Sequence, residues 1–322
     1  MGGWLAGRLL QALVVLAVMS FVIYALIGLM PGDPVDIMIA SDPRLAPQDA
    51  ARLRALYGLD LPIWERYLNW LGAALSGDFG YSRTYNRPVL EILLPRLGNT
   101  LLLLGIAATL AIAVAVTAGI VAALRPRGLL DTTINLACFA GVSVPPFWLA
   151  LVLIIVFAVT LGWLPAGGMG EADAPWSARA VHLVLPVATL MAASLAAYTR
   201  FARGAMIEAL RQDWIRTARA KGAGPARVVA GHALRNAMLP LVTVIALDFG
   251  TLFSGALITE TMFGWLGMGK LIYDSILGND FNTALVALLF ATGVVLLANV
   301  LADIAYAALD PRISYRAQEA RQ

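Results

Sequence analysis

Long apolar runs separated by shorter polar segments dominate the chain. A helix that crosses a membrane needs about 20 mainly apolar residues, and six runs are of this kind. They span residues 9–29, 100–124, 132–161, 181–199, 237–258 and 283–302. Pro145 and Pro146 should kink or break the third, and Asp248 in the fifth needs partners from neighbouring helices. The pattern predicts an all-α polytopic membrane protein with six transmembrane helices.

The composition agrees with this interpretation and excludes several classes. Apolar residues make up 60% of the 322 residues and charged residues only 13%, whereas soluble domains average about 25% charged residues. So few charges cannot cover the surface of a soluble globule, and so many apolar residues exclude a disordered chain. One cysteine and two histidines leave no disulfide framework and little for a metal centre. We therefore expect no metal or other cofactor bound by this chain.

Basic residues are distributed unequally among the segments between the runs. Segments 1–8, 125–131, 200–236 and 310–322 hold 14 of the 23 basic residues and 5 of the 20 acidic residues. Cytoplasmic loops are enriched in Lys and Arg, so these segments and both termini are predicted to be cytoplasmic. For the first run, a cleaved signal peptide is the alternative to a membrane anchor. Its length and the lack of an A-x-A site favour the anchor.

These boundaries divide the chain into four parts. Residues 1–30 hold the cytoplasmic amino terminus and the first transmembrane helix, 31–99 form an extracytoplasmic loop, 100–309 a five-helix core, and 310–322 a cytoplasmic tail. The loop contains seven prolines and several aromatic residues, and a helix is predicted over 47–57. It is either a compact subdomain near the membrane surface or a solvated loop with an interfacial aromatic belt. The two interpretations carry equal weight.

The segment 200–236 within the core is strongly basic. It carries eight basic and two acidic residues, and residues 205–221 are good helix formers. Gly222 and Gly224 suit a helix end, and Pro225 suits the first turn of a second helix. A helix–turn–helix at the cytoplasmic face is therefore predicted. The alternative is a basic loop that only contacts anionic lipid, which composition alone slightly favours.

Candidate catalytic motifs are incomplete. Residues 264–270 match the glycine and lysine positions of a phosphate-binding loop, but Leu271 replaces the Ser or Thr that binds magnesium. Ser143 lies in half of a nucleophile elbow, with proline in place of the last glycine. We therefore predict no nucleotide site and no hydrolase site in this chain.

Acidic residues within or beside the apolar runs are candidate functional groups, because an intramembrane carboxylate is costly. Asp248 lies mid-span; it either lines a polar cavity in a translocation pathway or is a hydrogen-bonded packing partner. Asn299 and Asp303, one helical turn apart, face the same way and are further pathway candidates. Glu260 lies near the outer end of its helix, where its carboxylate is expected to reach water.

Several short motifs are specific when taken together. They are MPGDP at 30–34, YGLDLP at 57–62, GDFGYS at 77–82, FW at 147–148, DWIRTARAKG at 213–222, HALRNA at 232–237 and LDPRI at 309–313. With these motifs, essentially the whole chain resembles the permease subunits of bacterial ABC importers of the dipeptide/oligopeptide/nickel family. It resembles the permease type that has a long loop after the first span.

The resemblance implies a type I ABC importer permease fold and a multi-pass location in the bacterial inner (cytoplasmic) membrane. It implies as partners a second homologous permease, two cytoplasmic ATPase subunits that bind ATP and Mg, and an extracytoplasmic binding protein. In this family a short helix docks in a groove of an ATPase subunit; by position it covers about 213–221. The coupling residues so implied are Asp213, Trp214, Arg216, Thr217, Ala218, Arg219, Ala220, Lys221 and Gly222.

The implied function is ATP-driven import, with this chain as a non-hydrolytic subunit that forms half of the translocation pathway. Short peptides are the expected substrate; nickel complexes, glutathione, opines and sugars are alternatives within the family. The chain departs from the broader Glu-Ala-Ala loop pattern, because Arg216 stands where that pattern has its acidic residue. The alternative class is an ion-coupled secondary transporter, but this would require inverted repeats, and the long loop follows only the first run. An intramembrane enzyme is disfavoured by the incomplete motifs.

Overall fold

The computed structural model describes residues 2–30, 52, 60–171 and 173–309. Within these ranges the regular structure is helical, apart from an isolated bridge between Tyr81 and Pro88. The expected all-α class is therefore confirmed for the described part of the chain. The helix predicted over 47–57 lies, apart from Arg52, outside the described residues.

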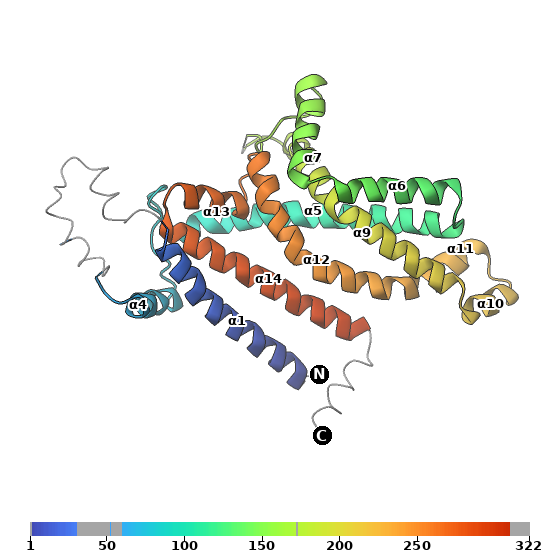
Figure 1. Ribbon diagram of the computed structural model, residues 1–322, viewed down its shortest axis with the longest axis horizontal. Coiled ribbons are helices and arrows are strands. Elements are labelled where there is room, and N and C mark those ends of the chain that lie inside the picture. The colour runs from blue at the N-terminus through green and yellow to red at the C-terminus, as the bar shows by residue number, and fades with distance from the viewer. Residues whose placement is uncertain (1, 31–51, 53–59, 172, 310–322) are drawn as a thin grey trace.

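Long helices form the body of the molecule (Figure 1): α1 (Gly2–Gly28), α5 (Val89–Leu124), α9 (Val184–Leu210), α12 (Leu234–Met262) and α14 (Phe281–Leu309). Shorter α-helices lie between them, namely α4 (Ile63–Leu75), α6 (Leu129–Ser143), α7 (Pro146–Leu153), α8 (Trp176–Val181), α10 (Asp213–Ala220), α11 (Pro225–Arg227) and α13 (Met268–Leu277). Two π-helical segments, η1 (Ile154–Thr160) and η2 (Val228–Ala233), follow α7 and α11.

Among the described residues, four helices are long and apolar enough to cross a membrane: α1, α5, α9 and α14. The bent pair made by α6 with α7 and η1 is a fifth candidate. The predicted run 237–258 lies within α12. The described part of the chain is thus helical with several candidate spans. The predicted run 181–199 begins before α9, because Val181 ends α8 and α9 begins at Val184.

The third predicted run is broken near its middle, as its two prolines predict. α6 ends at Ser143 and α7 begins at Pro146, and the chain bends by 103° between the two halves. Val144 and Pro145 between them have extended backbone angles, because a following proline disfavours the helical conformation.

α5 packs along α9 through a row of small residues. Ala107, Ala111 and Ala115 recur at every fourth position of α5 and are buried. Tyr198 and Ala202 of α9 share an apolar cluster with the last two. Small residues at this spacing let two helix backbones approach closely, which is a common source of packing energy between membrane helices.

The helix predicted over 205–221 is in fact two helices. α9 continues to Leu210, and α10 begins after Gln212, whose backbone is extended (φ −72°, ψ 152°). The break turns α10 so that Ile215 packs against neighbouring elements, and packing of this kind overrides local helix propensity. The second half of the prediction is confirmed, because Pro225 opens α11.

Several helix ends and turns lie toward two opposite sides of the molecule (Figure 1). The amino terminus, the end of α14, the α5–α6 turn and α10 lie toward one side, here called the α10 side. α4 and α13 lie toward the other, here called the α13 side.

The described part of the first long loop is packed against helices on the α13 side. Tyr67 of α4 shares a 2.7 Å hydrogen bond with Ser20 of α1. After α4, the chain is held by Asn282 at the start of α14, whose amide donates to the carbonyl oxygens of Phe79 and Tyr81 at 2.9 and 3.1 Å. This part of the loop is therefore hydrogen-bonded to both α1 and α14, the first and last long helices of the described chain.

Candidate functional site

α10 is a short amphipathic helix that is held to the bundle by one face. Ile215 and Ala218, three residues apart, are buried. Met206 and Ala209 of α9 and Val228 of η2 belong to the same apolar cluster. Burial of one isoleucine side chain contributes about 1.5–3 kcal/mol. α10 is therefore held in a defined orientation relative to α9 and α12.

The other face of α10 is exposed and carries a net positive charge. Trp214 is 47% exposed. The side chains of Asp213 and Arg216 are 92% and 79% exposed and form an ion pair at 3.4 Å. An exposed pair of this kind contributes only about 0–1 kcal/mol, so the Arg216 guanidinium can change partners at little cost. The remaining exposed residues of this segment are Thr217, Arg219, Ala220, Lys221 and Gly222.

Gly222 ends α10 in a left-handed conformation with φ 83°. Its N–H donates to the Arg219 carbonyl at 2.9 Å, and the N–H of Ala223 donates to the Ala218 carbonyl at 3.1 Å. This pair of bonds is a Schellman motif, which favours glycine because other residues seldom adopt positive φ. The glycine of the DWIRTARAKG motif therefore sets where α10 stops and in which direction the chain leaves it.

Asp248 lies on α12 and contacts α9. Its Oδ2 accepts hydrogen bonds from Ser194 Oγ at 2.6 Å and from the Tyr198 hydroxyl at 2.9 Å. Tyr198 is fully buried, whereas Asp248 is partly exposed. The hydrogen-bonded packing partners that the sequence interpretation required are therefore present, and they link two long helices.

Asn299 and Asp303 lie in the second half of α14, whereas Asp248 lies on α12. Asp303 forms an ion pair with Arg8 of α1 at 3.2 Å, and Asn299 is exposed. The structure thus assigns Asp303 a contact between the first and last long helices. Asp248, by contrast, is bonded to α9.

Glu260 is fully buried, so the expectation that its carboxylate reaches water is wrong. Thr100 donates to Glu260 Oε1 at 2.5 Å, and the backbone N–H of Lys270 donates to Oε2 at 3.1 Å. The physical reason is that segment 264–270 folds back over the end of α12 and supplies donors, which a buried carboxylate requires. The segment that resembles a phosphate-binding loop therefore surrounds a carboxylate of its own chain.

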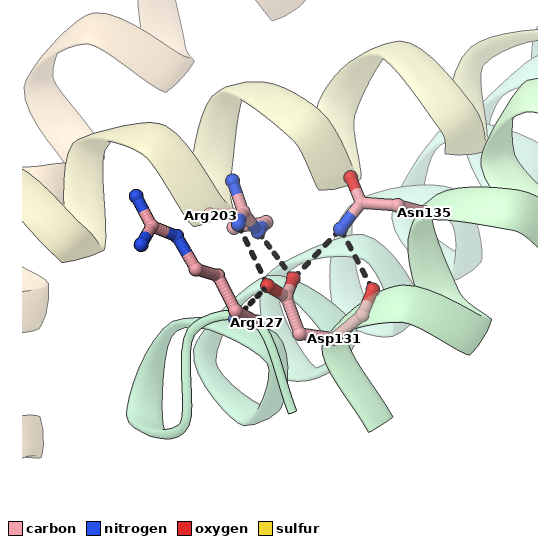
Figure 2. Close-up of polar contacts among 4 residues, drawn as sticks. All are labelled: Arg127, Asp131, Asn135 and Arg203. Atoms are coloured by element: carbon pink, nitrogen blue, oxygen red, sulfur yellow. Dashed lines mark hydrogen bonds and ion pairs between the residues drawn. The ribbon is translucent and has the colours of Figure 1, made fainter. Parts of the chain in front are cut away.

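A buried ion pair between Asp131 of α6 and Arg203 of α9 was missed by sequence reasoning (Figure 2). Arg203 Nε and Nη2 donate to Asp131 Oδ1 and Oδ2 at 2.5 and 2.8 Å. The Arg127 backbone N–H and the Asn135 amide each add a bond of 2.7 Å to the same carboxylate. The Asp131 side chain is only 4% exposed. The available signal was an aspartate at the start of the third apolar run, close to arginine.

Asp280 is a buried anchor on the α13 side. Its Oδ2 accepts hydrogen bonds from the Ser82 hydroxyl and, at 3.1 Å, from the Thr84 N–H. Oδ1 accepts one from the Thr283 N–H at 3.3 Å. Burial alone would raise the pKa of Asp280, but these hydrogen bonds outweigh burial and hold its pKa below the ordinary value. The ionised carboxylate therefore ties the loop after α4 to the start of α14.

Metal ligands do not cluster in the described part of the chain, where no group of three or more His, Cys, Asp or Glu is placed to hold an ion. His182 Nδ1 lies 2.9 Å from the Gly167 carbonyl oxygen, and His232 lies exposed on η2. Cys138 is buried and unpaired.

Two family models match the chain. Residues 115–315 match the model described as "Binding-protein-dependent transport system inner membrane component". Residues 1–104 match its companion, described as "Binding-prot-dependent transport system membrane comp, N-term". Together the two matches cover most of the chain and include both α10 and α14.

Curated relatives match over nearly their whole length. The oligopeptide transport system permease protein AppB of Bacillus subtilis is 37% identical over 98% of this chain and 100% of that protein. The di/tripeptide transport system permease protein DppB of Pseudomonas aeruginosa is 38% identical, and the dipeptide transport system permease protein DppB of Escherichia coli K12 is 36% identical. Each of the latter two matches covers 91% of this chain and 93% of the relative.

A solved structure of the MetNI methionine ABC transporter has a similar fold. The TM-score is 0.56, the sequence identity is 18%, and the match covers 69% of this chain and 97% of that chain. At such low identity the match shows a shared fold and nothing more. The family models and the curated relatives, by contrast, match the sequence over most of the chain. The chain therefore belongs to the family of binding-protein-dependent transport system inner membrane components, as a non-catalytic, multi-pass permease subunit of a bacterial inner-membrane ABC transporter.

Proposed function

We propose that this chain forms half of the translocation pathway of an importer for di- and oligopeptides, which alternates its access under the control of separate ATPase subunits. The observation that carries the proposal is α10, which is anchored by Ile215 and Ala218 and presents an exposed face of net positive charge. The substrate class is supported by relatives whose names specify oligopeptide, di/tripeptide and dipeptide transport. Peptides are accordingly preferred to nickel complexes, glutathione, opines and sugars.

The proposed topology has six transmembrane helices with both termini in the cytoplasm. α12 provides the sixth span beside the five candidates already described. The α10 side, which gathers the amino terminus, the α5–α6 turn and α10 (Figure 1), is then cytoplasmic. The division into 1–30, 31–99, 100–309 and 310–322 follows from this arrangement. Single cysteines can be placed in the α5–α6 turn and in the loop after α4, in sealed right-side-out vesicles. A thiol reagent that cannot cross the membrane should then modify only the cysteine after α4.

The proposed partners are a second homologous permease, two cytoplasmic ATPase subunits that hold ATP and Mg, and an extracytoplasmic binding protein. Residues 213–222 would dock α10 into a groove of one ATPase subunit, a common mode of helix recognition. Trp214 and the cations of the exposed face supply contacts of the kind that dominate protein interfaces. Because α10 is packed against the membrane helices, closure of the ATPase subunits would move α10 and with it the transmembrane helices.

The double variant Arg216→Glu/Arg219→Glu tests this coupling in the reconstituted importer. We expect loss of peptide import, with ATP hydrolysis no longer stimulated by the binding protein or with the motor subunits lost on purification. The matched control is Arg227→Glu/Arg235→Glu, which makes the same charge change in the same connection but outside α10. Normal import by the α10 variant would show that the coupling assignment is wrong.

Asp248 is the pathway residue that the geometry supports best, because it is partly exposed and lies between two long helices. Its carboxylate would offer a negative charge to the amino terminus of a passing peptide. Asn299 and Asp303 remain candidates of lower rank, since Asp303 is paired with Arg8. Asp248→Asn should raise the peptide concentration needed for half-maximal import, with Asp303→Asn as the control. Equal effects of the two variants would remove the special role of Asp248.

The substrate and the energy source can be tested together. The binding protein encoded beside this chain should retain short peptides on purification, and nickel or sugar in their place would change the substrate class. Import in proteoliposomes should stop when ATP is omitted and persist in the presence of an ionophore. The opposite pattern would favour the ion-coupled secondary transporter.

A further inference from the structure

An open pocket lies beside the Asp131–Arg203 ion pair, where the α5–α6 turn and α6 meet α9. Its volume is about 620 Å³. Its walls include Arg127, Asp131, Asn135, Leu136, Phe139 and Arg200. No part of the proposed coupling or translocation machinery uses this pocket.

The pocket carries unbalanced positive charge. The Asp131 carboxylate is already occupied by Arg203, by the Asn135 amide and by the Arg127 backbone N–H. Within the described ranges, the guanidinium groups of Arg127 and Arg200 have no acidic partner, and both residues are exposed. Two cations therefore face the pocket without a counter-charge from the neighbouring helices.

Arg127 is held in place by the same ion pair. Its backbone has φ 64°, a conformation that costs a non-glycine residue roughly 1–2 kcal/mol. The 2.7 Å bond from its N–H to Asp131 stabilises that conformation. Figure 2 shows the Arg127 side chain projecting beside Arg203, away from the carboxylate. The buried ion pair thus sets the backbone from which an unpaired guanidinium extends.

The pocket wall changes from polar to apolar along α6. Asn135 bonds to Asp131, whereas Leu136 and Phe139, farther along the helix, are 64% and 73% exposed. An α-helix rises about 1.5 Å per residue, so Phe139 lies roughly 12 Å beyond Asp131 along the axis. A charged end followed by an apolar wall of this length matches an amphiphile better than a small soluble anion.

We propose that this pocket binds an anionic phospholipid, with its phosphate between Arg127 and Arg200 and an acyl chain along Leu136 and Phe139. Arginine presents paired N–H donors that suit phosphate oxygens. Basic pockets between helices on the cytoplasmic side of a membrane bind anionic head groups. The proposal rests on the proposed topology, which places the α5–α6 turn at the cytoplasmic surface.

The test uses the intact importer complex, purified in a neutral detergent and depleted of lipid. Native mass spectrometry measures retention of dioleoyl phosphatidylglycerol and of dioleoyl phosphatidylcholine, which share acyl chains and differ in charge. We expect preferential retention of phosphatidylglycerol, weakened roughly tenfold or more by Arg127→Gln/Arg200→Gln. The control Arg125→Gln/Arg211→Gln removes two exposed cations outside the pocket and should change affinity less than about twofold.

Two further arms separate the lipid from other ligands. Leu136→Asn/Phe139→Asn should weaken phosphatidylglycerol binding, and excess inorganic phosphate should fail to displace the lipid. Displacement by phosphate would identify a soluble-anion site and overturn the proposal. So would unchanged lipid retention in the Arg127/Arg200 variant, or cross-linking of an Arg200→Cys variant to an ATPase subunit. Retention is measured without ATP or peptide, so its failure is distinguishable from failure of the proposed import function.

Discussion

Thr100 donates a hydrogen bond to the buried carboxylate of Glu260 at 2.5 Å and thereby joins α5 to the end of α12. The same hydroxyl oxygen accepts a 2.7 Å bond from the backbone N–H of Met268. α5 and the consecutive helices α12 and α13, which are far from it in sequence, therefore meet at one polar contact inside an apolar core. Because Glu260 is 0% exposed, each donor that reaches it matters for stability.

Replacement of Thr100 by valine should destabilise the protein. The variant leaves a buried carboxylate oxygen and the Met268 N–H without partners, at a cost of about 1–3 kcal/mol. Thermal unfolding in detergent should show a lower Tm. Thr117→Val is the matched control, because that hydroxyl is exposed and bonds only to Ala113 of its own helix at 2.8 Å. An equal Tm for the two variants would contradict the role given to Thr100.

Gly267→Ala should disturb the same contact from the other side. A Cβ at this position would overlap the Glu260 carboxylate, so the chain must shift and lose hydrogen bonds, at a cost of about 1–3 kcal/mol. Gly293→Ala in α14 is the control, because nothing lies within 4 Å of its added Cβ. We expect a clear fall in Tm for the first variant and little change for the second. An equal Tm for both variants would mean that segment 264–270 can shift without loss of stability.

Asp131→Asn should destabilise the α6–α9 contact. The change leaves the Arg203 guanidinium, whose side chain is 26% exposed, without its counter-charge. Breaking a fully buried pair costs about 3–5 kcal/mol, and the partial exposure of Arg203 reduces the expectation to roughly 1–3 kcal/mol. Asp213→Asn, which removes a 92% exposed partner, should be neutral within about 0.5 kcal/mol. Urea or thermal unfolding of the two variants provides the comparison.

Gly222→Ala should impair coupling more than folding. The substitution meets no neighbouring atom but forces alanine to φ 83°, which costs roughly 1–2 kcal/mol and misplaces the exit from α10. Gly224→Ala is the control, because Gly224 has φ −66° and equal space. We expect reduced import per ATP hydrolysed for Gly222→Ala and near-normal coupling for Gly224→Ala. Identical coupling ratios would argue against a defined α10 geometry.

Acid should weaken the contact made by Asp280. Its hydrogen bonds hold the pKa below the ordinary value despite burial, so its ionised form stabilises the folded state. That contribution is complete above the unfolded-state pKa of about 3.9 and is lost as the pH falls through the lower folded-state pKa. The Tm difference between wild type and Asp280→Asn should therefore shrink below about pH 4. A difference that stays constant to acid pH would contradict this assignment; the exposed Asp213→Asn variant serves as the reference.

The apolar runs and the short motifs were sufficient to predict the all-α class, the break in the third run, the end of α10 and the family. These features depend on local chemistry. Hydrocarbon-length apolar runs, consecutive prolines and a glycine at a helix end act mainly through the residues beside them. Their outcome in the structure therefore differs little from the outcome expected from the sequence.

Only the tertiary structure decided which polar groups meet. The burial of Glu260 and the pairing of Asp131 with Arg203 depend on contacts between helices that are distant in the sequence. The break between α9 and α10 depends on the packing of Ile215 against α9 and η2. The sequence around an acidic residue is the same whether its carboxylate is exposed to water or is hydrogen-bonded inside the protein. The free energy that separates these outcomes comes from desolvation and hydrogen bonding, and both are set by the neighbouring helices.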